Sequence, residues 1–219
     1  MENILDNIAL SYRTDKASKY HNYTKTYWNL FKDLRYNPVT LLELGIGDIN
    51  SENREGQSLN MWSEFFPIGK IYGIDIDLEK VSRYDTHPKI TTFWADQTSK
   101  IELESIAQKT NGFDIVIDDA SHIQSKTIAS FEILWPWVRS KGFYIVEDTV
   151  TSYWYNWEGG LPFNFDNNTI MNFAIDSVTY LNLLKQHTHN PPTNYTIPEY
   201  VRTLDSVTFV NGMIIFRKI

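Results

Sequence analysis

The sequence predicts an α/β fold built on a doubly wound, mostly parallel sheet with an antiparallel β-hairpin at its C-terminal end. Five short apolar runs alternate with helical segments, a pattern typical of βαβ units in a parallel sheet. Asn211-Gly212, a frequent hairpin turn, separates two further strand-like runs near the C-terminus. Acidic residues follow several of the predicted strands, at the edge where open α/β sheets bind their ligands.

Each predicted element follows from its local pattern. Residues 23–36 place apolar side chains at helical spacing, which predicts an amphipathic helix. The buried strand 39–45 leads into a glycine-bearing loop and a helix over 58–66, for which Ser58 is the expected N-cap. The predicted irregular segments are long enough to be lids or binding loops. These segments are residues 148–167 and 187–198. The remaining predicted strands are 70–76, 89–95, 113–118, 142–147, 206–210 and 213–219, and the remaining predicted helices are 100–109 and 125–136.

Length and composition limit the possible classes of protein. A chain of 219 residues suits one domain, 1–219, in which we expect residues 1–38 to form an N-terminal helical or lid segment and residues 39–219 the sheet core. A net charge of -7 without a basic stripe argues against a nucleic-acid partner. The absence of cysteine removes disulfides, thiolate metal sites and cysteine nucleophiles. With neither a signal-peptide pattern nor a membrane-length apolar run, the chain is expected to be soluble and cytoplasmic, without a membrane partner.

A glycine-bearing loop follows the first predicted strand. Gly45 and Gly47 allow the backbone to turn tightly and to approach a ligand. A dinucleotide fingerprint needs a third glycine where this chain has Asn50, so an ordinary βα turn explains the loop equally well. Asp75 ends the second strand and can accept hydrogen bonds from ribose hydroxyls, and Asp96 ends the third and can accept one from an adenine amino group. Either acid alone could be a solvated loop residue or a helix cap, but three such sites at consecutive strand ends favour a nucleotide-like ligand.

A second polar cluster follows the fourth predicted strand. The stretch FDIVIDDASHIQSK runs from buried residues directly into Asp118, Asp119 and His122, which could alternatively do no more than cap the next helix. Glu147 and Asp148 end the neighbouring strand and should face Asp119. Carboxylates that converge in this way repel one another unless a cation is present. Oxygen ligands without cysteine suit Mg²⁺ best, with Mn²⁺ or Ca²⁺ as lesser options.

Several of these stretches resemble the class I S-adenosylmethionine-dependent methyltransferases, whose fold is Rossmann-like. The specific likeness is to the metal-dependent sugar O-methyltransferases of macrolide and anthracycline-type pathways, such as those acting on mycinamicin and elloramycin. The resemblance rests on LLELGIG, GQSLNMWSEFFPIGKIYGIDI, ADQ, FDIVIDDASH and GFYIVEDTVTSYW, and it covers roughly residues 40–155 and the terminal hairpin. DDASH has Ala120 where the family usually has glycine, a small change that we expect to be tolerated.

The resemblance implies a cofactor, a metal and a general base. Asp119, Glu147 and Asp148 match the family's metal ligands, and His122 matches its general base. Asp118 could contact the cofactor or only cap the next helix. The residues expected to bind S-adenosyl-L-methionine are Glu43, Gly45, Gly47, Ser58, Asp75, Asp96, Gln97 and Asp118.

Aromatic residues near these motifs are candidates for contact with the acceptor. Tyr153 and Trp154 could stack on a sugar face, or they could plug the end of the sheet without touching a ligand. His21 and Tyr23 could close over the cofactor, although an isolated histidine is more often structural.

The sequence therefore predicts a Mg²⁺-dependent O-methyltransferase that acts on a hydroxyl of a sugar or glycosylated small molecule, with a homo-oligomer possible. Two rivals keep the fold, namely a catechol-type O-methyltransferase and an enzyme like the cephalosporin hydroxylases. A nicotinamide-dependent oxidoreductase is disfavoured by the missing third glycine and by the terminal hairpin. A ligand-binding module without enzymatic activity is the remaining alternative.

Overall fold

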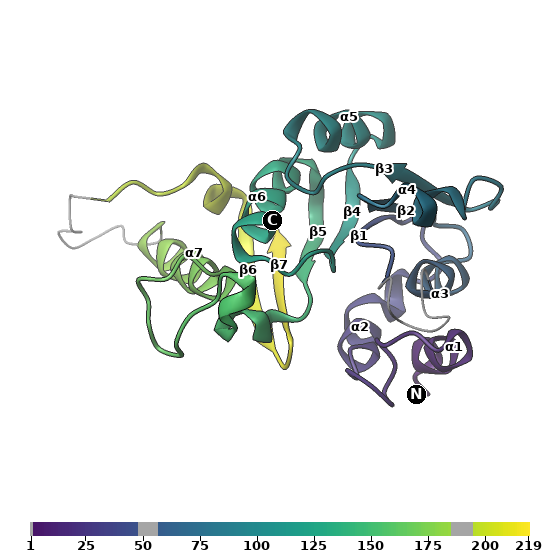
Figure 1. Ribbon diagram of the computed structural model, residues 1–219, viewed down its shortest axis with the longest axis horizontal. Helices are drawn as coiled ribbons and strands as arrows, with labels where there is room; N and C mark the ends of the chain where they lie inside the picture. The colour runs from purple at the N-terminus through teal and green to yellow at the C-terminus, as the bar shows by residue number, and fades with distance from the viewer. Residues whose placement is uncertain (1, 48–56, 185–194) are drawn as a thin grey trace.

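A computed structural model describes residues 2–47, 57–184 and 195–219 (Figure 1). Its centre is a seven-stranded sheet with strand order β3-β2-β1-β4-β5-β7-β6. The first five strands pair in parallel, and β7 runs antiparallel to both β5 and β6, so the predicted fold class is confirmed. The strands are β1 Thr40–Leu44, β2 Lys70–Asp75, β3 Ile90–Trp94, β4 Phe113–Asp118, β5 Val138–Val146, β6 Leu204–Val210 and β7 Met213–Lys218.

Helices cover both faces of the sheet. On one face, α1 (Ile4–Tyr12), α2 (Thr24–Phe31) and α3 (Gln57–Phe65) pack against side chains such as Leu41. On the other face, α5 (Lys100–Thr110), α6 (Gln124–Leu134) and α7 (Ile170–Leu184) pack against side chains such as Leu42. The two groups of helices lie on opposite sides of the sheet in Figure 1. A doubly wound sheet explains why β1 and β4 are buried along most of their length.

The carboxyl ends of β1, β4 and β5 are held side by side beyond the last paired residues. The Asp119 amide donates to the Leu44 carbonyl at 3.0 Å, and the Glu147 amide donates to the Asp118 carbonyl at 3.0 Å. The loops that follow these strands therefore start from one aligned edge, and this edge carries the predicted polar clusters.

The C-terminal hairpin forms at Asn211-Gly212 as predicted, and its turn reaches back to the polar edge. Gly212 has φ +77°, a conformation that favours glycine, and a Cβ there would meet the Tyr23 hydroxyl at 2.5 Å. The Thr149 amide donates to the Gly212 carbonyl at 3.1 Å, so the turn also fastens the loop that follows β5.

Several boundaries differ from the predictions. The helix predicted over 23–36 ends at Phe31 and continues as a short 3₁₀ turn, Lys32–Leu34. Ser58 lies inside the first turn of α3 and is not its N-cap, because that helix begins at Gln57. The sequence analysis also missed α1, α4 (Leu78–Ser82) and α7, and β5 begins four residues earlier than predicted, at Val138 and not at residue 142.

The two segments predicted to be irregular have different outcomes. Residues 148–167 contain two short 3₁₀ helices, Thr149–Tyr153 and Tyr155–Trp157, separated by turns. Most of the second segment, including His187 and His189, lies outside the described residues. No described helix is long and apolar enough to cross a membrane.

Candidate active site

Two cavities lie at the carboxyl edge of the sheet and share part of their walls. One has a volume of about 520 Å³, and residues of the loops after β1, β2 and β3 line it. The other has a volume of about 680 Å³ and lies between the N-terminal segment, the loop after β5 and the hairpin turn. His122 and Asp148 line both cavities, so an ion or group held by these two residues would face the ligands of both cavities.

The smaller cavity gathers five of the residues expected to bind the cofactor. Gly45 has φ +90°, and a Cβ there would lie 2.2 Å from the Asp119 carbonyl oxygen, so glycine is required for the β1 and β4 loops to touch. The members of the predicted set that line this cavity are Gly45, Gly47, Asp75, Asp96 and Gln97.

Asp75 and Asp96 organise the loops that form this cavity. The Asp75 carboxylate accepts hydrogen bonds from the amides of Ile46 and Asp77 at 2.9 and 2.8 Å, which joins the loops after β1 and β2. Asp96 accepts from the amide and hydroxyl of Thr98, and these bonds lower the pKa of its carboxyl. Both carboxylates are therefore held in place by hydrogen bonds, with acceptor capacity left for ligand hydroxyl or amino groups.

Gln97 links this cavity to the loop that carries His122. Its Oε1 accepts from the Ser121 amide at 3.2 Å, while its buried Nε2 has no hydrogen-bond partner among the described residues. A buried donor without a partner costs free energy unless a ligand or water satisfies it, so Gln97 is a candidate ligand contact.

Three residues predicted to bind the cofactor do not line this cavity. Asp118 is buried on the other side of β4, where its Oδ2 accepts from Ser130 at 2.6 Å and Tyr144 at 2.9 Å. Burial raises the pKa of Asp118 to about 6, and these two bonds oppose the rise. Ser58 and Glu43 are not among the residues that line the cavity, and the fully buried Glu43 lies 3.3 Å from Lys16 of the N-terminal segment. The structure therefore does not bring Asp118, Ser58 or Glu43 to the cofactor cavity.

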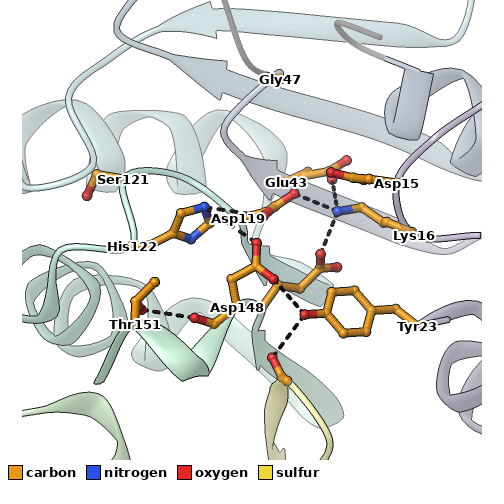
Figure 2. A network of polar contacts seen from close by, with 12 residues as sticks. Asp15, Lys16, Tyr23, Glu43, Gly47, Asp119, Ser121, His122, Asp148 and Thr151 are labelled. Carbon is orange, nitrogen blue, oxygen red and sulfur yellow. Dashed lines mark hydrogen bonds and ion pairs between the residues drawn. The ribbon is translucent and has the colours of Figure 1, made fainter. Parts of the chain in front are cut away.

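Asp119, His122 and Asp148 form a compact group between the two cavities (Figure 2). His122 Nε2 lies 4.0 Å from Asp119 Oδ1 and 3.7 Å from Asp148 Oδ2. One ligand atom from each residue lies within 4.8 Å of the other two, close enough for all three to surround one ion.

A loop presents this group. The helix expected from residue 125 begins at Gln124 with Ile123 as its N-cap, so Asp119 and His122 precede it. His122 has a left-handed backbone with φ 57°, and Asp148 has φ 50°. Left-handed residues other than glycine cost free energy and concentrate at functional sites. The alternative that DDASH only caps the helix is wrong, because Ile123 occupies the cap position.

Glu147 is not part of this group, although it shares the Lys16 ammonium with Asp119. Its Oε2 accepts from Lys16 Nζ at 2.7 Å, and its Oε1 accepts from the Tyr27 hydroxyl. Burial raises the pKa of Glu147 well above its ordinary value, and the Lys16 charge opposes the rise. Of the three carboxylates predicted to hold the metal, the structure thus brings Asp119 and Asp148 together around His122, while Glu147 faces the N-terminal segment.

Lys16 is the main site residue that sequence reasoning missed. It lies between α1 and α2, is fully buried, and places Nζ 2.6 Å from Asp119 Oδ2 and 3.3 Å from Glu43 Oε1. Burial alone would lower the pKa of Lys16, but the surrounding carboxylates outweigh burial and raise the pKa well above its ordinary value. Lys16 is therefore a permanent cation inside the cluster. No local pattern marks it, because its partners are more than twenty residues away along the chain.

The N-terminal segment also contributes to both cavities. Asp15 lines the smaller cavity, and Tyr20, His21 and Tyr23 line the larger one. The Tyr23 hydroxyl donates to Asp148 Oδ1 at 2.6 Å, so it holds that carboxylate with Oδ2 directed toward His122. His21 and Tyr23, which the sequence suggested could close over the cofactor, line the larger cavity and not the smaller one.

The larger cavity has an aromatic wall. Tyr153 and Trp154 line it together with Trp157. Tyr153 is 40% and Trp154 47% exposed, so neither is a buried plug for the sheet. Aromatic faces beside polar groups suit the apolar face of a sugar ring.

The donor groups fit a hard divalent cation. Asp119 Oδ1 and Asp148 Oδ2 are the carboxylate oxygens that face His122, while the second oxygen of each is bound to Lys16 and to Tyr23. Mg²⁺ is commonly held by one or two carboxylates and completes its shell with waters and substrate oxygens. Two oxygens at the boundary of two cavities meet this requirement.

Curated sugar O-methyltransferases are similar to this chain over part of their length. Mycinamicin VI 2''-O-methyltransferase of Micromonospora griseorubida is 40% identical over 151 residues, which is 68% of this chain and 37% of that protein. L-olivosyl-oleandolide 3-O-methyltransferase of Streptomyces antibioticus is 35% identical over 180 residues, 80% of this chain and 46% of that protein. This chain thus spans less than half the length of these relatives. No protein-family model matches it.

Solved structures give the same resemblance over nearly the whole chain. The MycE methyltransferase of the mycinamycin biosynthetic pathway, in complex with Mg and SAH, matches 98% of this chain and 53% of its own with a TM-score of 0.87 and 31% identity. The complex that also contains mycinamycin VI matches 98% of this chain and 54% of its own, with a TM-score of 0.84 and 31% identity. The resemblance to sugar O-methyltransferases and the class I methyltransferase fold are both confirmed.

Proposed function

We propose that this chain, which has the class I methyltransferase fold and resembles sugar O-methyltransferases, is a Mg²⁺-dependent S-adenosylmethionine O-methyltransferase that acts on a hydroxyl of a sugar or glycosylated small molecule. The observation that carries the proposal is the shared wall of the two cavities. His122 and Asp148 border both, as required of groups that act where a methyl donor meets an acceptor hydroxyl.

The smaller cavity is the proposed site of the methyl donor. Asp75 and Asp96 would accept hydrogen bonds from ribose hydroxyls and the adenine amino group, and the Gly45 and Gly47 loop would lie along the methionine part. Gln97 has a free buried donor for the same ligand. The donor's methyl group would then point toward His122 and the larger cavity. MycE, similar in structure, is described with SAH and Mg, which supports this cofactor pair.

The larger cavity is the proposed acceptor site. Its aromatic wall of Tyr153, Trp154 and Trp157 would hold a sugar face, with a ring hydroxyl directed at His122. Relatives are named for 2''-O-methylation of mycinamicin VI and for 2'-O-methylation of a rhamnosyl tetracenomycin, which supports a glycoside acceptor. Tyr153 and Trp154 in this wall are partly exposed to solvent, so a bulky aglycone could extend outward past them.

The residues around His122 would perform the proton transfer. Asp119 and Asp148 would hold a divalent cation whose charge lowers the pKa of the acceptor hydroxyl. His122 Nε2 would take the hydroxyl proton, and Tyr23 would keep Asp148 in place while this occurs. Most of the acceleration would come from holding donor and acceptor in line, because the sulfonium methyl is already activated. Glu147 remains a proposed metal ligand on the condition that its carboxylate leaves Lys16 and binds the divalent cation instead.

Product mass tests the proposed reaction against its rivals. The protein is incubated with S-adenosylmethionine carrying a deuterated methyl group, Mg²⁺ and a panel of glycosides and catechols. A glycoside that gains one labelled methyl group supports the proposal, and methylation of catechols alone would favour the catechol-type rival. Gain of one oxygen without the label would indicate a hydroxylase. Binding of Mg²⁺ and cofactor without any product across the panel would favour a ligand-binding module.

A further inference from the structure

Gln124 carries a buried side-chain amide at the first residue of α6, beside the loop that presents His122. The residue is 1% exposed, and its amide forms both of its donor bonds and two acceptor bonds. Nε2 donates to the His122 carbonyl at 3.0 Å and to the Thr151 hydroxyl at 3.2 Å. Oε1 accepts from the Ser152 hydroxyl at 2.9 Å and from the Ile170 amide at 3.0 Å. One amide therefore joins the loops after β4 and β5 to the start of α7.

The two donor bonds of this amide lead to the two left-handed residues that border both cavities. His122, with φ 57°, is held directly through its carbonyl. Asp148, with φ 50°, is held through Thr151, whose hydroxyl accepts from Gln124 and donates to the Asp148 carbonyl at 2.9 Å (Figure 2). Residues other than glycine keep such a backbone only where their surroundings stabilise it. Gln124 is thus linked to both strained positions.

The place of the His122 ring depends on its backbone. The described residues form no hydrogen bond to this ring, whose Nε2 lies 4.0 Å from Asp119 Oδ1 and 3.7 Å from Asp148 Oδ2. The Asp148 side chain is held by Tyr23, but its backbone conformation is supported by the bond from Thr151. Support of the two backbones therefore sets where the ring and the carboxylate meet.

We propose that Gln124 is a positioning residue that holds His122 and Asp148 in their left-handed conformations and so keeps both side chains at the boundary of the two cavities. The inference rests on the proposed function for the roles of these two residues as base and metal ligand. The bonds from Ser152 and Ile170 to Oε1 anchor the amide, so that its two N–H groups keep their direction. Hydrogen bonds behind the direct ligands of a metal site commonly tune metal affinity and activity.

Gln124→Met keeps the length of the side chain and removes both donor bonds. The rate of methyl transfer at saturating Mg²⁺ and S-adenosylmethionine should fall roughly 10–100-fold, the usual effect of losing a hydrogen bond behind a metal site. Affinity for S-adenosylmethionine should stay within about twofold, because Asp75 and Asp96 lie at the ends of other strands. The loss should therefore fall on the rate and not on donor binding.

Thr151→Val breaks only the branch that leads to Asp148. Its Mg²⁺ affinity, measured by calorimetry, should be weaker than that of the unmodified protein, and its rate should recover at saturating Mg²⁺. Gln124→Met also loses the branch to His122, so its rate deficit should persist at saturating Mg²⁺. If Gln124→Met does not fold, Thr151→Val decides the question, and unchanged Mg²⁺ affinity in this variant overturns the inference.

Ser177→Ala is the matched control for general damage. Ser177 is fully buried in α7, bonds Phe173 and Tyr200, and lines neither cavity. Its replacement should lower the melting temperature and leave the rate of methyl transfer unchanged. Rates are compared at a temperature at which every variant is folded.

NMR of ¹⁵N-labelled histidine tests the inference without any turnover. In Gln124→Met the ring signals of His122, assigned with His122→Ala, should shift or broaden, while those of His87 stay in place. Ser177→Ala should change neither set. Unchanged His122 signals in folded Gln124→Met would overturn the inference, as would an equal rate loss in Ser177→Ala.

Failure of the proposed function gives a different result. The unmodified protein would then methylate no glycoside, while the His122 signals of Gln124→Met would still move. That combination supports the positioning role of Gln124 and contradicts the assigned reaction. Methyl transfer by the unmodified protein together with a full rate in Gln124→Met would support the reaction and contradict the positioning role.

Discussion

His122 combines a left-handed backbone with a place on the wall of both cavities. Its ring nitrogen lies beside two carboxylates, yet no hydrogen bond to Nε2 is formed at 3.7 and 4.0 Å. The nitrogen is therefore available to accept a proton from a bound hydroxyl. This geometry favours a base over a structural histidine, whose ring nitrogens are usually bonded.

Replacing His122 with alanine should lower the methyl-transfer rate by roughly 10²–10⁴, the usual contribution of a positioned general base. The deficit should persist when Mg²⁺ is raised to saturation, because the carboxylates that hold the ion remain. His87→Ala is the matched control, since the His87 ring accepts from the amides of Lys89 and Ile90 and lines neither cavity, so the rate should stay unchanged. Recovery of His122→Ala to near the unmodified rate in excess Mg²⁺ would instead identify His122 as a metal ligand.

Asp75→Ala should weaken binding of S-adenosylmethionine by roughly 1–3 kcal/mol, the cost of leaving partners of a buried polar contact unpaired. Calorimetry gives the affinity directly. Asp77→Ala is the control two residues away, because Asp77 caps α4 and does not line the cavity. Equal affinities for the two variants would remove Asp75 from the donor site.

How far the site could be predicted also depends on individual residues. Asp75, Asp96 and Asp119 were found because strand ends are local features of the sequence. Asp118 was assigned to the cofactor, but successive side chains of a strand point to opposite faces, and Asp118 faces Tyr144 in the core. Lys16 could not be found, because its three carboxylates are brought together only by the folded sheet.

At the scale of elements, α1 and the segment that follows it place Lys16 at the edge of the sheet. Asp6 in α1 accepts hydrogen bonds from the Ser18 amide and hydroxyl at 2.8 and 2.6 Å and from the Thr24 hydroxyl at 2.6 Å. One side chain thus joins α1, the loop with Lys16 and the start of α2. This link was not predicted, because Ser18 and Thr24 lie 12 and 18 residues from Asp6 along the chain.

Asp6→Asn should lower the free energy of unfolding by roughly 1–3 kcal/mol at neutral pH, because the amide loses the charged hydrogen bonds. Burial would raise the pKa of Asp6, but the bonds from Ser18 and Thr24 outweigh it and hold the pKa below 3.8. The stabilisation is therefore present above pH 3.8 and is lost as the pH falls through the lower, folded value.

Urea unfolding at several pH values measures this difference. The difference in the free energy of unfolding between Asp6→Asn and the unmodified protein should disappear as the solution becomes more acidic. Asp33→Asn, at an exposed position on the 3₁₀ turn after α2, should show no such difference. A difference that is constant with pH would mean that packing, and not the charge of Asp6, holds the segment.

At the scale of the whole molecule, the strand order places two polar clusters at adjoining strands. β1 lies between β2 and β4, and β5 follows β4, so the loops of the donor cavity and of the acidic group share one edge. The alternation of strands and helices and the Asn211-Gly212 turn were enough to predict the doubly wound sheet and its terminal hairpin, but not this strand order. The meeting of the cavities at His122 was not predictable, because it depends on loop conformations with positive φ. The division into residues 1–38 and 39–219 stays a proposal.

The dependence of methyl transfer on a divalent cation tests the central claim most directly. The rate of transfer from labelled S-adenosylmethionine to an accepted glycoside is measured before chelation, after thorough chelation and after Mg²⁺ is restored. The structure predicts that chelation abolishes transfer and that Mg²⁺ restores it, while Asp148→Asn, which removes one of the two metal-facing carboxylates, needs more Mg²⁺ for half the maximal rate. Full activity after chelation would contradict the account, since Asp119 and Asp148 would then hold no metal that the reaction requires.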